Sequence, residues 1–251
     1  MLPDALFLNV HMYGIMLALG ILAAFSSLWL YGKKLGLSTV ITDFIFYDGM
    51  LSIMAGFGSA ALFQSLYNYI EDPSHGFHLG EGITFIGGLI GGAACFLAVF
   101  YILRGKLPFT LSQLLEIVPC CITVAHGFGR VGCFFAGCCY GRPTDSFLGV
   151  KFPQLPEPVH PTQLYEAAFL FALFGVLSYL LLSKKSKYNF EIYLIAYGIF
   201  RFLIEFLRDD ARGKLIGIVS PSQFWSILMI LIGIGMVGAE HYKAAKTAEN
   251  E

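Results

Sequence analysis

Charged residues are scarce in this chain. Asp, Glu, Lys and Arg make up only 13% of its 251 residues, whereas soluble globular domains carry about 25%. The formal net charge is −1, and no basic patch is large enough for a nucleic-acid-binding protein. No basic stretch precedes the first apolar segment, so we expect no cleaved signal peptide. Hydrophobic residues reach 57%, and the composition predicts an integral membrane protein.

The chain also lacks the cysteine spacing typical of metal sites. Cys133, Cys138 and Cys139, with His126, could suggest zinc, but no Cys-x-x-Cys pair is present and neighbouring cysteines rarely bind one ion together. Two alternatives exist for the three cysteines: they form a disulfide, or they are small residues that allow close packing. We expect neither a metal nor another cofactor, and the redox state of the three stays open. The remaining cysteines, Cys95, Cys120 and Cys121, are predicted to be buried packing residues.

Long apolar segments dominate the rest of the sequence. Seven are candidates to cross a bilayer, which takes about 20 apolar residues: 12–31, 44–67, 83–103, 111–123, 164–182, 191–207 and 221–237. The fourth is short, and either continues through His126 or is tilted or broken. We therefore predict an all-α integral membrane protein with a single polytopic domain, 1–251, of about seven transmembrane helices with a broken or short fourth segment. A glycine- and cysteine-rich loop, 127–159, lies within it.

Basic residues predict the orientation. Lys and Arg fall in alternate loops, near Lys33, Arg104, Lys184 and Lys243, whereas the loop 68–82 has none. The positive-inside rule then places the N-terminus outside and the C-terminus in the cytoplasm. The loops 127–159 and 208–220 would face outward, although both contain arginines. Basic residues on that side indicate a use such as holding a lipid phosphate.

The most informative stretch is 125–142, which combines glycines, cysteines and arginines beside apolar segments. Arg130 and Arg142 offer forked donors that match phosphate, and Gly132 and Gly137 allow the backbone to approach a ligand closely. The alternative is that the arginines reach lipid headgroups at the interface without a specific function.

Arg201, Glu205 and Arg208 are spaced i, i+4 and i+7, which predicts one face of the sixth span. Ionisable groups in a membrane helix are costly and usually face a cavity. We expect Glu205 to fix one arginine while the other meets a ligand. A structural ladder of ion pairs is the alternative.

The segment 160–166 begins the fifth span. His160 and Thr162 could cap the helix, line a pocket, or do both. Three further polar residues follow at membrane depth: Gln163, Tyr165 and Glu166. Tyr13, which opens the first span, is most simply an interfacial tyrosine.

Taken together, these residues resemble the bacterial prolipoprotein diacylglyceryl transferases over nearly the whole chain. The family pattern Gly-Arg-x-Gly-Asn-Phe-x-x-Gly-Glu-x-x-Gly-Arg is matched from Gly129 to Arg142, with Cys133 and Cys138 in place of Asn and Glu. The His-Pro-Ser/Thr-Gln-Leu-Tyr-Glu motif corresponds to 160–166. The Phe-Arg-x-x-x-Glu-x-x-Arg motif corresponds to 200–208, and the early Tyr-Gly to 13–14. A family histidine in the third span is replaced by Ile86.

The resemblance implies transfer of a diacylglyceryl group from phosphatidylglycerol to the thiol of a lipobox cysteine in a prolipoprotein, in the bacterial plasma membrane. It assigns Arg130 and Arg201 to the phosphate, and Glu205 with Arg208 to orienting Arg201. His126 or His160 would be the base, with His126 preferred because it is nearer the signature. The residues that would contact substrate are Tyr13, Gly132, Cys133, Gly137, Arg142, Gln163, Tyr165, Glu205 and Arg208. Two alternatives remain: a paralogue with the same lipid donor and another acceptor, and a non-catalytic phospholipid-binding module.

Overall fold

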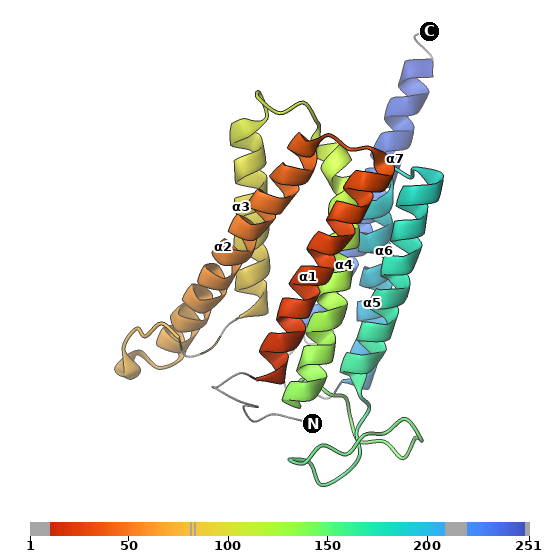
Figure 1. Ribbon diagram of the computed structural model, residues 1–251. Helices are drawn as coiled ribbons and strands as arrows, with labels where there is room; N and C mark the ends of the chain where they lie inside the picture. Colours follow the sequence, from red (N-terminus) through yellow and green to blue (C-terminus); the bar gives the residue numbers. More distant parts are fainter. Residues whose placement is uncertain (1–10, 81, 83, 209–219, 249–251) are drawn as a thin grey trace. The chain divides into compact units, whose positions relative to one another are not determined.

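The computed structural model describes residues 11–80, 82, 84–208 and 220–248, and its long elements are α-helices (Figure 1). The chain divides into two compact units. The small unit, Gly36–Leu114, contains α2 and α3, and the large unit, Met1–Leu35 with Leu115–Glu251, contains the other helices. The helices are α1 (Met12–Leu35), α2 (Thr39–Glu71), α3 (Phe85–Leu103), α4 (Leu111–Ala136), α5 (Thr162–Tyr179), α6 (Asn189–Ile204) and α7 (Pro221–Ala248). Three short helical turns extend or link these helices: η1 (Pro73–His75), η2 (Leu180–Lys184) and η3 (Glu205–Leu207).

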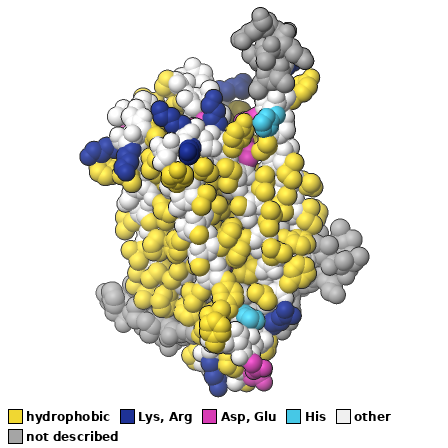
Figure 2. All heavy atoms as spheres, turned by 90° about the vertical axis from the view of Figure 1, so that its right-hand side faces the viewer, with side chains coloured by type: hydrophobic (Ala, Val, Ile, Leu, Met, Phe, Trp, Pro, Cys, Tyr) yellow, Lys and Arg dark blue, Asp and Glu magenta, His cyan; other side chains and the backbone are white. Residues whose placement is uncertain are grey.

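Six of these helices are long and apolar enough to cross a membrane. The exception is α6, which has only 16 residues and carries Glu191 and Arg201. Large hydrophobic side chains such as Trp29, Met54 and Leu231 are exposed, while Glu166 is fully buried. On the face shown in Figure 2, hydrophobic side chains fill a broad central region. Apolar outside and polar inside is the distribution expected of a protein whose surroundings are lipid.

Small residues set the packing in the small unit. A Cβ atom added to Gly91 of α3 would lie 2.2 Å from the Ser59 Cβ of α2, and one on Gly87 would lie 2.7 Å from the Phe63 Cβ. The two helices therefore pack closely at these glycines, as small residues allow in membranes. The Ser59 hydroxyl also donates to the Gly87 carbonyl (2.8 Å).

In the large unit, glycines also allow close helix packing around α4. A Cβ atom on Gly20 of α1 would lie 2.9 Å from the Ala125 carbonyl oxygen, and one on Gly127 would lie 2.8 Å from the Phe171 ring of α5. Gly198 of α6 packs as closely against Ile230 of α7. These contacts bring the polar residues of α4, α5 and α6 together inside an apolar unit.

Of the alternatives for the fourth segment, continuation through His126 is confirmed, and a broken or short segment is not. α4 runs without interruption for 26 residues, and the glycine-rich stretch up to Ala136 is helical. Pro119 lies inside the helix, where the Thr123 hydroxyl donates to its carbonyl (2.5 Å). Proline is tolerated inside membrane helices, and α4 continues through it. The loop predicted at 127–159 therefore begins only at Gly137.

The segment between α4 and α5 is irregular but anchored. It forms isolated bridges that pair Gly141 with Arg208 and Val159 with both Pro143 and Val150. Phe152 is fully buried within it. These contacts hold the start of α5 against the end of α4, which is where the predicted site residues gather. The loop 208–220 lies outside the described residues except for its two ends.

Candidate functional site

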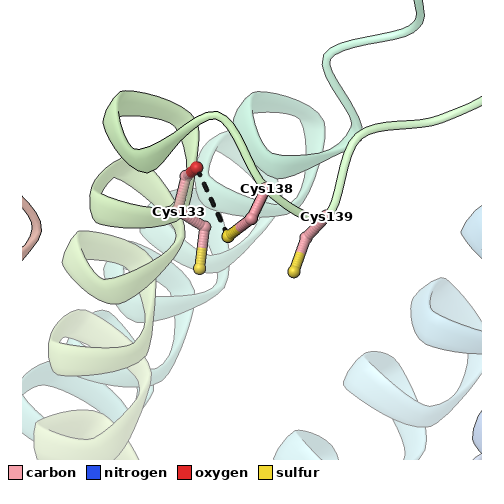
Figure 3. A group of neighbouring side chains, drawn as sticks. All are labelled: Cys133, Cys138 and Cys139. Carbon is pink, nitrogen blue, oxygen red and sulfur yellow. Dashed lines mark hydrogen bonds between the residues drawn. The ribbon is translucent and has the colours of Figure 1, made fainter. Parts of the chain in front are cut away.

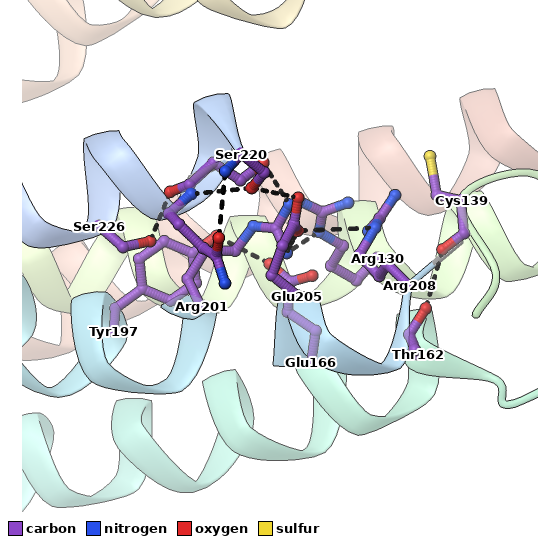
Figure 4. A network of polar contacts seen from close by, with 12 residues as sticks. Arg130, Cys139, Thr162, Glu166, Tyr197, Arg201, Glu205, Arg208, Ser220 and Ser226 are labelled. Carbon is purple, nitrogen blue, oxygen red and sulfur yellow. Dashed lines mark hydrogen bonds and ion pairs between the residues drawn. The ribbon is translucent and has the colours of Figure 1, made fainter. Parts of the chain in front are cut away.

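Glu166 of α5 is the centre of a buried polar cluster in the large unit. Its side chain is fully buried, and its Oε1 atom lies 3.1 Å from Nε of Arg130 and 3.8 Å from Nε2 of His126, both on α4. The Tyr197 hydroxyl of α6 donates to the same oxygen (2.7 Å). The rings of His126 and Tyr197 meet edge to face, with centroids 5.2 Å apart. Three helices thus meet at one carboxylate oxygen (Figure 4).

A second cluster lies at the end of α6. Nη1 of Arg201 lies 2.9 Å from Oε2 of Glu205, and its Nη2 donates to the Ser222 hydroxyl of α7 (2.8 Å). The Ser220 hydroxyl donates to the other Glu205 oxygen (2.8 Å). Nε of Arg208 lies 4.0 Å from Oε2 of Glu205. The pairing of Glu205 with Arg201 forms as the i, i+4 spacing predicts.

The prediction that Arg208 shares the helical face of the sixth span was wrong. α6 ends at Ile204, the turn Glu205–Leu207 is a 3-10 helix, and Arg208 is extended (φ −91°, ψ 148°). Its side chain is nevertheless almost fully buried and reaches Glu205 across the tightened turn. Three arginines and two carboxylates thus meet in the two clusters.

The segment 160–166 does not cap α5 with side chains. The N-cap residue is Pro161, with no side-chain cap. Instead, the Thr162 hydroxyl donates to the Cys139 carbonyl (2.9 Å) and Nε2 of Gln163 donates to the Cys138 carbonyl (2.5 Å). Both side chains are fully buried, so the first turn of α5 holds the loop cysteines in place.

His160 and Arg142 lie outside the two clusters. Nδ1 of His160 lies 3.3 Å from the Tyr165 hydroxyl. Arg142 is exposed, and its backbone N–H donates to the Leu207 carbonyl (2.8 Å). Of the two histidines proposed as base, only His126 contacts Glu166 within the described part of the chain.

The predicted glycines have packing roles in the structure. A Cβ atom on Gly132 would lie 3.0 Å from the Tyr13 ring, so Tyr13 packs directly on α4. Gly137 has φ +70°, a left-handed conformation that ends α4 and suits glycine. Its N–H donates to the Phe134 carbonyl (3.1 Å).

The sulfur atoms of Cys133, Cys138 and Cys139 all lie within 4.8 Å of one another (Figure 3). Cys138 is exposed, and the other two are half-buried. Hydrogen bonds from Cys133 and Cys138 hold the pKa of the Cys139 thiol well below its ordinary value, and the positive charges of Arg208 and Arg130 act in the same direction. The loop therefore presents a compact group of sulfurs beside the arginines.

Sequence analysis missed two members of the central cluster. Glu166 was noted as polar at membrane depth but not assigned to the site, and Tyr197 was not noted at all. A carboxylate in an apolar span is a signal of function in its own right. Tyr197 lies four residues before Arg201 on α6, a spacing that places both on one helical face.

Comparison with known proteins adds evidence from the whole chain. Residues 3–239 match the family model of the prolipoprotein diacylglyceryl transferases. A Clostridium tetani protein named phosphatidylglycerol–prolipoprotein diacylglyceryl transferase is 37% identical over 94% of this chain and 95% of its own length. Relatives from Clostridium perfringens (33% identical, 95% of this chain and 94% of its own length) and Aeromonas salmonicida (32%, 93% and 87%) have names that state the same activity. With these matches and the clustered arginines, the chain belongs to the prolipoprotein diacylglyceryl transferase family.

Proposed function

We propose that this protein is a membrane transferase that moves the diacylglyceryl group of phosphatidylglycerol to a prolipoprotein. The observation that carries the proposal is the pair of buried guanidinium groups, Arg130 and Arg201, each held by a carboxylate inside the large unit. A lipid phosphate is the anion that such groups would meet inside a bilayer. The names of the relatives indicate phosphatidylglycerol as the donor and a prolipoprotein as the acceptor.

The acceptor would be the thiol of a lipobox cysteine. Its sulfur attacks the glyceryl carbon next to the phosphate, a sulfur–carbon bond forms, and the carbon–oxygen bond to the phosphate breaks. Glycerol phosphate leaves with the electron pair of that bond. Arg130 and Arg201 stabilise the charge that develops on the leaving phosphate, which is the kind of interaction that lowers the barrier most.

Each carboxylate has a positioning role in this scheme. Glu166 holds Arg130 through its Nε atom, 3.1 Å from Oε1. Glu205 and Ser222 orient Arg201 through its two outer nitrogen atoms, Nη1 and Nη2. A guanidinium whose orientation is already fixed loses less conformational entropy when it binds phosphate. His126, which lies 3.8 Å from Glu166 at the edge of the central cluster, would take the proton of the acceptor thiol.

The protein would lie in the bacterial plasma membrane, with its N-terminus outside and its C-terminus in the cytoplasm. The basic residues of alternate loops support this orientation. It would put the segment between α4 and α5, and with it the two arginine clusters, toward the outer leaflet, where secreted precursors arrive.

The test is an assay with purified protein in detergent, phosphatidylglycerol and a lipobox peptide, followed by mass spectrometry of the peptide. We expect the peptide to gain one diacylglyceryl group. The controls are a peptide with serine in place of its cysteine and a lipid with an ethanolamine headgroup. Lipid consumption with unmodified peptide would point to another acceptor, and lipid binding without any turnover would point to a binding module.

A further inference from the structure

Three sulfur atoms converge at the end of α4. Cys133 lies in the last turn of the helix, and Cys138 and Cys139 follow it directly, so that all three sulfurs lie within 4.8 Å of one another. Zinc–sulfur bonds of about 2.3 Å place thiolates about 3.8 Å apart in a tetrahedral site. Figure 3 shows the three side chains grouped at the end of α4, and closing their sulfurs to that spacing would require side-chain rotation.

The backbone that presents these sulfurs is held in an unusual conformation. Cys139 has φ +65°, which is rare for a residue other than glycine. Such a conformation persists where the surroundings enforce it, and it is common at functional sites. Here the enforcing groups are Thr162 and Gln163, two fully buried side chains that bind the Cys139 and Cys138 carbonyls.

The donor set suits a soft metal ion with one open position. Thiolates favour zinc and copper(I) over hard cations. Within the described residues, the group of ligand-type side chains at this point contains only the three cysteines. Three protein ligands with an open fourth position are the arrangement of catalytic zinc sites, whereas structural zinc sites have four. The exposed Cys138 gives an ion access.

The site also lies next to the arginine assigned to the phosphate. Cys133 follows Arg130 by three residues on α4, and residues at that spacing share a helical face. Figure 4 shows Cys139 together with the arginines, and its carbonyl accepts a hydrogen bond from the Thr162 hydroxyl. A thiol bound at the open position would therefore lie beside the group that receives the leaving phosphate.

We propose that Cys133, Cys138 and Cys139 bind one zinc ion, and that the acceptor cysteine binds to it as the fourth thiolate. This inference rests on the proposed function. A thiol that coordinates zinc is deprotonated, and its proton passes to His126, the base of the proposed function. The bound sulfur then forms the bond to the glyceryl carbon as the carbon–oxygen bond to phosphate breaks. Zinc keeps its oxidation state throughout, and no oxidant or reductant is needed.

The first test is metal content. Protein purified without chelator should contain about one zinc per chain by mass spectrometry, and Cys138→Ser and Cys139→Ser should lose most of it. Cys95→Ser, on α3, is the matched control and should keep its zinc. Cobalt(II) exchanged into the site should give thiolate-to-metal absorption, and a lipobox peptide, but not its serine counterpart, should change that spectrum.

The outcomes separate this inference from the proposed function. Zinc-free protein that modifies the peptide as fast as zinc-loaded protein would overturn the zinc site and leave the transferase standing. A disulfide among the three cysteines in the active protein would overturn it as well. If the cysteine peptide does not change the cobalt spectrum, the acceptor thiol does not bind to the metal. If the cysteine peptide binds to the metal but no lipid is consumed, the site stands and the transferase activity fails.

Discussion

Replacing Glu166 with glutamine should destabilise the protein and slow its reaction together. Oε1 of Glu166 lies 3.1 Å from Nε of Arg130, and at an effective dielectric constant of about 20 two unit charges at that distance attract by about 5 kcal/mol. Glutamine keeps an oxygen for the Tyr197 hydroxyl but loses the charge. Removing one partner of a buried ion pair typically costs about 3–5 kcal/mol, because the other charge stays buried without compensation. We expect a loss of about 3 kcal/mol in the free energy of unfolding.

The effect on turnover follows from the same geometry. Without the carboxylate, the Arg130 guanidinium is no longer fixed by an ion pair, and misplacing a catalytic group by about 1 Å can cost about 100-fold in rate. Both quantities can be measured on one preparation: unfolding by titration with sodium dodecyl sulfate in mixed micelles, and kcat and KM in the peptide assay. Because Glu166 acts through Arg130, we expect kcat to fall more than KM rises.

Glu191→Gln is the matched control. Glu191 is a buried carboxylate at the start of α6, and the described part of the chain offers it no ion pair. Neutralising it should leave turnover unchanged and should not lower stability. If Glu166→Gln behaves like this control in both measurements, Glu166 does not position Arg130 and the central cluster is not the phosphate site.

Three further substitutions test separate parts of the site. Arg130→Lys should lower kcat strongly, because an ammonium group cannot replace the bidentate guanidinium fork. Arg104→Lys, outside the cluster, is the control and should leave kcat unchanged. Equal rates for the two variants would show that Arg130 does not bind the phosphate. His126→Ala should be slow at every pH, and its rate should not fall further toward low pH, because that fall is caused by protonation of the base. If the rate of the variant still falls toward low pH, His126 is not the base. Gly137→Ala should lower the free energy of unfolding by about 1–2 kcal/mol, because φ at this position is +70°. Gly175→Ala is the control and should be near neutral, because a Cβ atom there meets no other atom within 4 Å. Thermal unfolding of the two variants measures the difference.

Helix positions were largely predictable because they depend on local composition. The segment predicted at 83–103 is α3 (Phe85–Leu103), and the first and seventh segments begin at the predicted residues, Met12 and Pro221. The ion pair between Arg201 and Glu205 followed from spacing alone, because neighbours at i, i+4 meet on any helix. The end of α4 was misplaced, since the glycines at 127–132 resemble a loop. Their lack of side chains serves close packing against α1 and α5 instead.

The contacts that define the site join residues far apart in the sequence, and no local pattern contains them. One oxygen of Glu166 meets groups from α4 and α6, and two buried side chains of α5 orient the loop cysteines. The spacing of Cys133, Cys138 and Cys139 argued against a metal because it was read along the chain. A left-handed turn at Gly137 and a second one at Cys139 fold that spacing back on itself, so the sulfurs converge without a Cys-x-x-Cys pair. Spacing in sequence therefore does not predict how closely the sulfur atoms lie where a helix end reverses the chain, and zinc analysis of the purified protein decides between the expectation of no metal and the proposed site.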